Sequence, residues 1–214
     1  MNLQTLISEL KREGIQDPKV LDAIAHIPRH LFVPPEYQSE AYENHPLPIG
    51  HGQTISQPFI VAQMTELALG GKNLSRVLEV GTGCGYQAAM LSALVEEVYS
   101  IERIEDLYQE SKQRLNELNY KNIYLKHGDG YEGWPEHAPY QGIIITAAPD
   151  HIPEKLLQQL DMGGRMVLPL DTGSKQTLVL IQRQEAGFKR TSIEDVRFVP
   201  MLQGQVSLKH RDSI

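Results

Sequence analysis

Hydrophobic positions along most of this chain alternate between two periods, which predicts strands and helices in succession. An apolar run at Val77–Val80 precedes a small-residue helical stretch from Tyr86 to Val95. A second run follows at Val98–Ile101, and then an amphipathic stretch around Leu107. Strand, helix, strand, helix is typical of a parallel sheet with crossover helices. The pattern predicts an α/β fold with a doubly wound, mostly parallel sheet.

Later apolar runs extend this predicted sheet. Three short runs read as further strands, at Ile123–Leu125, Ile143–Ile145 and Met166–Leu168. A helix is expected over Pro153–Leu160, before the last of them. Leu178–Ile181 and Val196–Val199 lie on either side of a turn region at Gly187, and they predict a closing antiparallel pair.

The first 58 residues follow a different pattern. Helical spacing of apolar residues ends at Gly14, and Asp17 with Pro18 predicts the start of a second short helix. Residues 28–58 then hold six of the chain's 13 prolines, so neither a continuous helix nor a central strand is expected there. A long irregular segment of this kind is usually functional or disordered, and its aromatic residues argue against disorder. A helix is expected again over Phe59–Leu69.

Composition limits the classes of function. The length of 214 residues suits one domain, residues 1–214, with about the first 58 covering its ligands. The 20 basic and 27 acidic residues give a net charge of -7, which offers no broad attraction to nucleic acid or to an anionic membrane. A single cysteine, and the lack of a leader or an apolar run that could span a bilayer, predict a cytoplasmic protein.

A glycine-rich turn, VLEVGTGCGYQAA, follows the first predicted strand of the sheet and opens a helix. Gly81 and Gly83 would let a ligand approach the backbone closely, and the helix start offers unpaired N–H groups. The dinucleotide fingerprint needs a small third residue, but Tyr86 stands there, which makes NAD and FAD unlikely ligands. No P-loop pattern is present.

Acidic residues near three strand ends indicate which ligand this turn binds. Glu102 stands about 20 residues after Gly81, the separation at which an acid reaches ribose hydroxyls. Glu79 would place negative charge beside the turn, which disfavours a pyrophosphate and favours a cationic ligand. Asp129 could accept from an adenine amine, and the Gly130 backbone could pair with the ring. S-adenosylmethionine, with its sulfonium and amino groups, satisfies these requirements.

Several motifs together resemble the protein-L-isoaspartate (D-aspartate) O-methyltransferase family, a branch of the S-adenosylmethionine-dependent methyltransferases. The matching segments cover most of the chain: RHLFVP (Arg29–Pro34), AYENHPLPIGHGQTISQP (Ala41–Pro58), the glycine turn, GDG (Gly128–Gly130), GGRMVLPL (Gly163–Leu170) and VRFVP (Val196–Pro200). The glycine turn alone identifies only the superfamily, whereas the TISQP segment is more specific.

The resemblance implies a function and roles for individual residues. It implies methyl transfer from S-adenosylmethionine to the α-carboxyl group of L-isoaspartyl residues in damaged proteins and peptides, which starts their repair through a succinimide. Ser56 would be the catalytic residue, and Gln53, Thr54 and Ile55 would contact the substrate. Val199 and Pro200 would form the opposite wall of the substrate cleft.

Other interpretations remain open from the sequence. Ser56 could instead cap the helix that begins near Pro58, although the proline makes Gln57 the expected cap. The same fold could methylate another acceptor, or the chain could bind damaged proteins without catalysis. His26 and His30 have the spacing of a metal pair, but Pro28 breaks the helix that would align them, so no metal is predicted.

Overall fold

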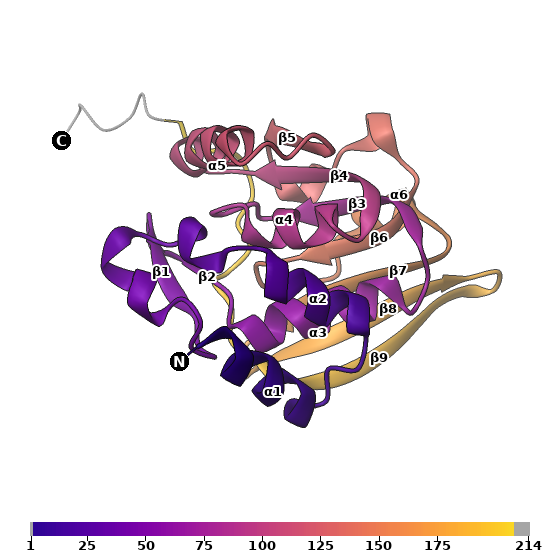
Figure 1. Ribbon diagram of the computed structural model, residues 1–214. Helices are drawn as coiled ribbons and strands as arrows, with labels where there is room; N and C mark the ends of the chain where they lie inside the picture. Colours follow the sequence, from indigo (N-terminus) through magenta and orange to yellow (C-terminus); the bar gives the residue numbers. More distant parts are fainter. Residues whose placement is uncertain (1, 208–214) are drawn as a thin grey trace.

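A seven-stranded mixed sheet forms the centre of the computed structural model, which describes residues 2–207 (Figure 1). Its order is β5-β4-β3-β6-β7-β8-β9, in which the first five strands are parallel and the last two add antiparallel neighbours. The bounds are β3 Leu74–Val80, β4 Val95–Glu102, β5 Ile123–His127, β6 Tyr140–Ile145, β7 Leu160–Asp171, β8 Gln176–Gln184 and β9 Gly187–Val196.

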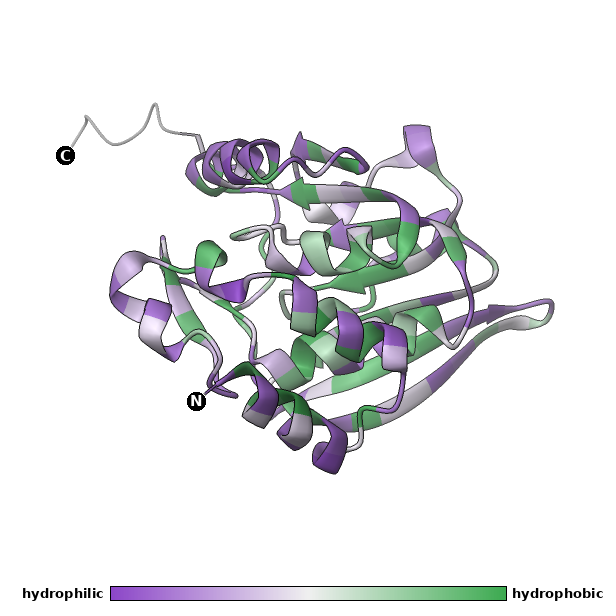
Figure 2. Cartoon of the chain, in the orientation of Figure 1, coloured by the Kyte–Doolittle hydropathy of each residue, from purple (hydrophilic) through white to green (hydrophobic). Residues whose placement is uncertain are grey.

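Helices cover both faces of this sheet, which confirms the doubly wound prediction. One face packs against α1 Leu3–Glu13, α2 Pro18–His26, α3 Pro58–Leu69, α4 Tyr86–Ser92 and α5 Glu105–Glu117, and the other against α6 Glu154–Gln159. Successive residues of β3 point to opposite faces, so Val77 belongs to the first core and Leu78 to the second. Figure 2 shows hydrophobic residues concentrated in the strands and in α3, and a largely hydrophilic α5.

Local signals place the first helices as predicted. The Asn2 side chain accepts from Thr5 N at the start of α1, and the helix ends at Gly14 with φ of 112°. Asp17 caps α2 by accepting from Lys19 N, with Pro18 as the first helical residue. Both helices pack beside α3 in the first core.

Three predictions about the elements need correction. The strand expected at Val196–Val199 is instead β9, Gly187–Val196, and the residues after it leave the sheet. Helix α4 ends at Ser92 rather than Val95, because β4 begins at Val95. Residues 28–58 are not wholly irregular: they form 3-10 helices η1 Arg29–Phe32 and η2 Pro35–Glu40 and a hairpin of β1 Leu47–Gly50 and β2 Gln53–Ile55.

Two segments cross the carboxyl ends of the parallel strands. The β1–β2 hairpin lies there (Figure 1), and its tip faces α5, where His51 Nδ1 is 3.5 Å from Asp106 Oδ2 and Nε2 is 3.6 Å from Glu110 Oε1. Residues 197–207 pass over the same strand ends, since Met201 N donates to Ala148 O and Glu105 N to Val206 O. The hairpin and this crossing segment therefore enclose the edge at which parallel sheets bind ligands.

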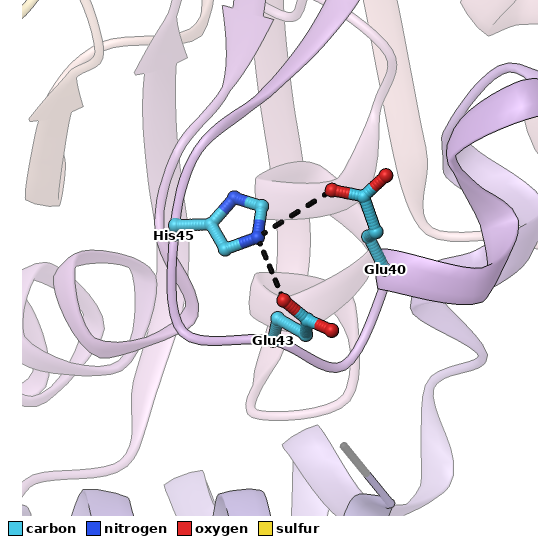
Figure 3. A group of neighbouring side chains, drawn as sticks. All are labelled: Glu40, Glu43 and His45. Atoms are coloured by element: carbon cyan, nitrogen blue, oxygen red, sulfur yellow. Dashed lines mark hydrogen bonds and ion pairs between the residues drawn. The ribbon is translucent and has the colours of Figure 1, made fainter.

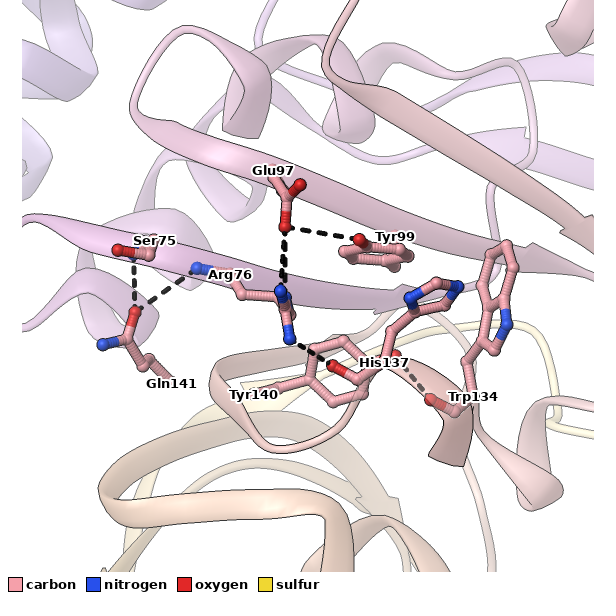
Figure 4. A network of polar contacts seen from close by, with 8 residues as sticks. All are labelled: Ser75, Arg76, Glu97, Tyr99, Trp134, His137, Tyr140 and Gln141. Carbon is pink, nitrogen blue, oxygen red and sulfur yellow. Dashed lines mark hydrogen bonds and ion pairs between the residues drawn. The ribbon is translucent and has the colours of Figure 1, made fainter.

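The opposite ends of the strands are closed by a polar and aromatic network (Figure 4). Arg76 Nε donates to Glu97 Oε2 at 3.2 Å and its Nη1 to His137 O at 2.9 Å. Tyr99 stacks on His137 and meets Trp134 edge-on, so the Trp134 ring packs against the aromatic side chains of this network. This network joins β3 and β4 to the loop before β6. No helix in residues 2–207 is both long and apolar enough to cross a membrane.

Candidate active site

A cavity of about 150 Å³ opens at the carboxyl ends of β3 and β4, under the hairpin and the crossing segment. We call it the strand-end cavity. Its floor includes Gly81 and Gly83 of the glycine turn, Glu102 forms part of the wall, and Gly130 follows β5. Gln53 and Thr54 of β2 line it from above. Four of the six predicted cofactor residues therefore line one cavity.

Two glycines keep backbone exposed to this cavity. Gly81 has φ of 99°, and a Cβ there would collide with Oγ1 of Thr146. A Cβ on Gly130 would collide with Cγ1 of Val80. A side chain at either position would thus disturb the cavity wall.

Glu102 is fixed by the backbone around the cavity. Its Oε2 accepts from Gly83 N and its Oε1 from Ile104 N, each at 2.9 Å, and the side chain is almost fully buried. Carboxylate oxygens can accept further hydrogen bonds, so a diol at this strand end could still be bound. Asp129 is held differently: its oxygens accept from Tyr131 N and Gly204 N, and it does not line the cavity.

Glu79 lies fully buried below the glycine turn. Ser100 Oγ donates to Glu79 Oε2 at 2.5 Å, while Oε1 has no hydrogen-bond partner in the described part of the chain. Burial raises the pKa of this carboxyl to about 8, and the hydrogen bond from Ser100 opposes the rise. Glu79 lines a small pocket of about 40 Å³, the turn pocket, together with Thr82 and Ser56. An uncompensated oxygen of this kind suits a cationic ligand.

A larger groove of about 650 Å³, the open groove, lies beside the cavity. Thr54 and Thr146 line the open groove, the strand-end cavity and the turn pocket, so they stand where the three spaces meet. Ser56 lines the groove and the turn pocket. Val199 lines the groove and the cavity, whereas Pro200 lines only the cavity.

Ser56 follows β2 and precedes α3. Gln57 is the N-cap of α3 and makes no side-chain cap bond, so Ser56 is not the cap. Among residues 2–207 no group hydrogen-bonds the Ser56 hydroxyl, while Arg29 Nη2 donates to the Ser56 carbonyl at 2.8 Å. Of the residues predicted to contact substrate, Thr54 lines the groove, Gln53 faces the cavity, and Ile55 is buried.

Thr146 lines the site, although no motif in the sequence assigns it a role. It ends β6, and its Oγ1 donates toward Val80 O at 3.0 Å and Gly81 O at 2.7 Å. These bonds tie the end of β6 to the glycine turn. Its position directly after a buried strand was the only signal available.

One group of side chains in the described residues could reach a single metal ion: Glu40, Glu43 and His45 (Figure 3). His45 Nε2 lies 3.1 Å from Glu43 Oε2 and 3.7 Å from Glu40 Oε2, and all three side chains are partly exposed. The hydrogen bond to the Pro46 carbonyl and the two acids raise the pKa of His45. His26 and His30 are not brought together as a pair: His26 contacts Asp22, and His30 contacts Tyr42.

This arrangement fits S-adenosylmethionine. At Gly81 and Gly130 a ligand can approach the backbone closely, and Glu102 stands at the end of β4. Among the described residues, one oxygen of the buried Glu79 beside the turn has no hydrogen-bond partner. A doubly wound sheet with such a site defines the chain as a methyltransferase of the S-adenosylmethionine-dependent class.

Comparisons with known proteins narrow this class. The sequence model of the protein-L-isoaspartate(D-aspartate) O-methyltransferase family matches residues 1–206. Protein-L-isoaspartate O-methyltransferases from Halorhodospira halophila and Pseudomonas aeruginosa are 55% and 52% identical to this chain. The matches cover 94% and 95% of it, and 91% and 97% of the relatives. The chain therefore belongs to this family, and its activity is that of a protein-L-isoaspartate O-methyltransferase.

Solved structures agree in fold. A protein-L-isoaspartate O-methyltransferase with 30% identity superposes with a TM-score of 0.85 over 93% of this chain and 65% of that longer one. A Plasmodium falciparum protein of the same description, in complex with S-adenosyl-L-homocysteine, has 25% identity and a TM-score of 0.79. That match covers 94% of this chain and 99% of the other. The predicted fold, cofactor and enzyme class are thereby confirmed.

Proposed function

We propose that Ser56 is the catalytic residue and that it orients the α-carboxylate of an L-isoaspartyl residue lying in the open groove. The observation that carries the proposal is the position of Ser56: its hydroxyl has no partner in residues 2–207, and it faces both the groove and the turn pocket. A hydroxyl can donate to one carboxylate oxygen without competing for the methyl group.

The chemistry needs little acid–base help from the protein. The bound cofactor supplies a methyl group on a positively charged sulfur, and a carboxylate is already an anionic nucleophile at neutral pH. One carboxylate oxygen forms the new bond to the methyl carbon as the carbon–sulfur bond breaks, and no proton is transferred. The residues must therefore supply orientation, which can be worth several kcal/mol of the barrier.

Separate residues serve the two substrates in this proposal. Glu102, Gly81, Gly83 and Gly130 would hold the adenosyl part in the strand-end cavity, and Glu79 would face its cationic end. Thr54 and Thr146 line both the cavity and the groove, so they bound the passage between donor and acceptor. Asp129, with both oxygens held by backbone N–H groups, would act by fixing the loop that carries Gly130.

The groove supports an extended polypeptide as the acceptor. Phe59 and Phe198 supply apolar surface, and Glu13, Asp195 and Arg197 supply charge along its rim. We include in the proposal damaged proteins and peptides as substrates, with no nucleic acid or membrane partner, and a cytoplasmic location. Methylation of the isoaspartyl α-carboxylate would start repair, because the ester closes to a succinimide more readily than the free acid.

The proposal also takes residues 1–214 as one methyltransferase domain in which the first 58 residues cover the ligands. Helices α1 and α2 pack in the same hydrophobic core as α3 and β3, which supports a single domain.

A matched pair of peptides tests the acceptor. The protein is incubated with methyl-labelled S-adenosylmethionine and a peptide that contains either isoaspartate or aspartate at one position. Base-labile labelled methanol is expected from the isoaspartyl peptide only. Equal labelling of both peptides, or of neither while the cofactor still binds, would reject the proposed acceptor.

A further inference from the structure

Arg29 is the largest fully buried side chain in the described part of the chain. It is 1% exposed, and no carboxylate in residues 2–207 forms an ion pair with it. Burial lowers the pKa of its guanidinium, and among the described residues its Nε and Nη1 have no hydrogen-bond partner. A buried cation without a counter-ion is costly, so the remaining contacts of Arg29 must offset that cost.

The guanidinium of Arg29 joins two parts of the active site. Its Nη2 donates to the Ser56 carbonyl at 2.8 Å, across 27 positions of sequence. Its Cζ lies 5.0 Å from the centre of the Tyr86 ring, and Tyr86 is the first residue of α4, the helix that the glycine turn opens. Phe32, also from η1, meets the same ring edge-on at 5.4 Å. Arg29 thus connects Ser56 to the start of α4.

The Ser56 backbone depends on such a contact because of its place between two elements. Strand β2 ends at Ile55 and α3 begins at Pro58, so Ser56 lies outside both. Pro58 has no N–H to donate, and the N-cap residue Gln57 makes no side-chain cap bond. The side chain that reaches the first turn of α3 is Asn44, whose Oδ1 accepts from Phe59 N at 3.0 Å. A carbonyl in this position is oriented by whatever donor reaches it, and Arg29 supplies that donor.

We propose that Arg29 is a positioning residue for methyl transfer, which fixes the Ser56 main chain against α4 and thereby aims the Ser56 hydroxyl into the open groove. The inference rests on the catalytic role proposed for Ser56. A planar guanidinium can donate to the Ser56 carbonyl and lie over the Tyr86 ring at the same time. A lysine ammonium is a compact point charge on a flexible aliphatic chain. Lysine at this position would keep the charge and lose the geometry.

A double-mutant cycle distinguishes positioning from a purely structural role. The four proteins are the wild type, Arg29→Lys, Ser56→Ala and the double variant, with kcat and KM measured on the isoaspartyl peptide and the cofactor Kd by calorimetry. Because Arg29 acts through Ser56, Arg29→Lys is expected to lower kcat about 30-fold in the wild-type background and less than about threefold beside Ser56→Ala. The cofactor Kd is expected to change less than about threefold in all four.

Arg165→Lys is the matched control. Arg165 is partly buried, and like Arg29 it donates to a backbone carbonyl: its Nε donates to Leu67 O, away from the groove and the cavity. It is expected to leave kcat within about twofold of the wild type. If Arg29→Lys does not fold, Arg29→Met, which keeps the stem without the charge, replaces it in the cycle.

Other results of the cycle would overturn the proposed role of Arg29. An equal fold-loss from Arg29→Lys in both backgrounds would overturn positioning through Ser56, and so would wild-type kcat in Arg29→Lys while Ser56→Ala is inactive. Full activity of Ser56→Ala would instead reject the catalytic role of Ser56, and the role of Arg29 would fall with it.

Discussion

Replacing Glu79 with glutamine is expected to remove a pH dependence of stability that the buried carboxyl creates. The wild-type side chain is fully buried, with one oxygen bonded to Ser100 and the other without a partner in the described residues. Burial raises its pKa from 4.5 to about 8. The folded chain therefore keeps this proton at pH values where the unfolded chain has released it.

The size of the effect follows from that difference. At about 1.4 kcal/mol for each pKa unit, ionisation of Glu79 costs the folded state about 5 kcal/mol in full. Its contribution to the free energy of unfolding is fully present below pH 4.5, falls as pH rises, and is lost once pH passes 8. At pH 7 about 3 kcal/mol should already be lost.

Urea unfolding of the wild type and Glu79→Gln at pH 5, 7 and 8.5 measures this loss. Glutamine resembles the protonated acid, so the two proteins should be similar in stability at pH 5, and the variant should be more stable by about 3 kcal/mol at pH 7. Glu96→Gln, an exposed acid on β4, is the matched control for the loss of a carboxylate. A stability difference between the wild type and Glu79→Gln that stays constant across the three pH values would show that Glu79 does not titrate with a raised pKa in the folded chain.

Three other predictions concern the cofactor. Glu79 must lose its proton to face a cation, so the Kd for S-adenosylmethionine measured by calorimetry should be about tenfold higher at pH 7 than at pH 9. In Glu79→Gln the Kd should be the same at both pH values. Gly81→Ala should weaken cofactor binding more than tenfold, because the new Cβ would meet the Thr146 side chain. Gly163 also has a positive φ, but a Cβ there would meet no other atom, so Gly163→Ala should cost only about 1 kcal/mol of stability and leave the cofactor Kd unchanged. Glu102→Gln removes the negative charge that strengthens the hydrogen bonds from Gly83 N and Ile104 N, so it should weaken cofactor binding about 10- to 100-fold. An unchanged cofactor Kd would exclude Glu102 from the site.

The sequence predicted the fold well where side chains repeat with a regular period. Buried strands such as β6 are continuous apolar runs, and their order with the helices requires a doubly wound sheet. Strand β9 was misplaced because it lies at the sheet edge and carries mostly exposed polar residues, so it lacks an apolar alternation. The β1–β2 hairpin was missed because Pro48 stands inside β1, where the alternation of buried Leu47 and Ile49 was the only signal.

Backbone topology alone brings several of the predicted cofactor residues together in one cavity. Gly81, Gly83 and Glu102 meet because they end or follow adjacent parallel strands. Thr146 was missed because a threonine carries no distinctive chemistry until its neighbours in space are known. Likewise, the bond between Arg29 and the Ser56 carbonyl depends on how the N-terminal segment folds over α4, which no short-range pattern encodes.

The catalytic role of Ser56 is tested by measuring kcat of Ser56→Ala on the isoaspartyl peptide at saturating S-adenosylmethionine, with the cofactor Kd measured on the same preparation. If Ser56 orients the acceptor carboxylate, kcat should fall about 100-fold while the Kd stays within about twofold of the wild type. A folded Ser56→Ala protein with kcat within twofold of the wild type would show that Ser56 does not orient the acceptor carboxylate.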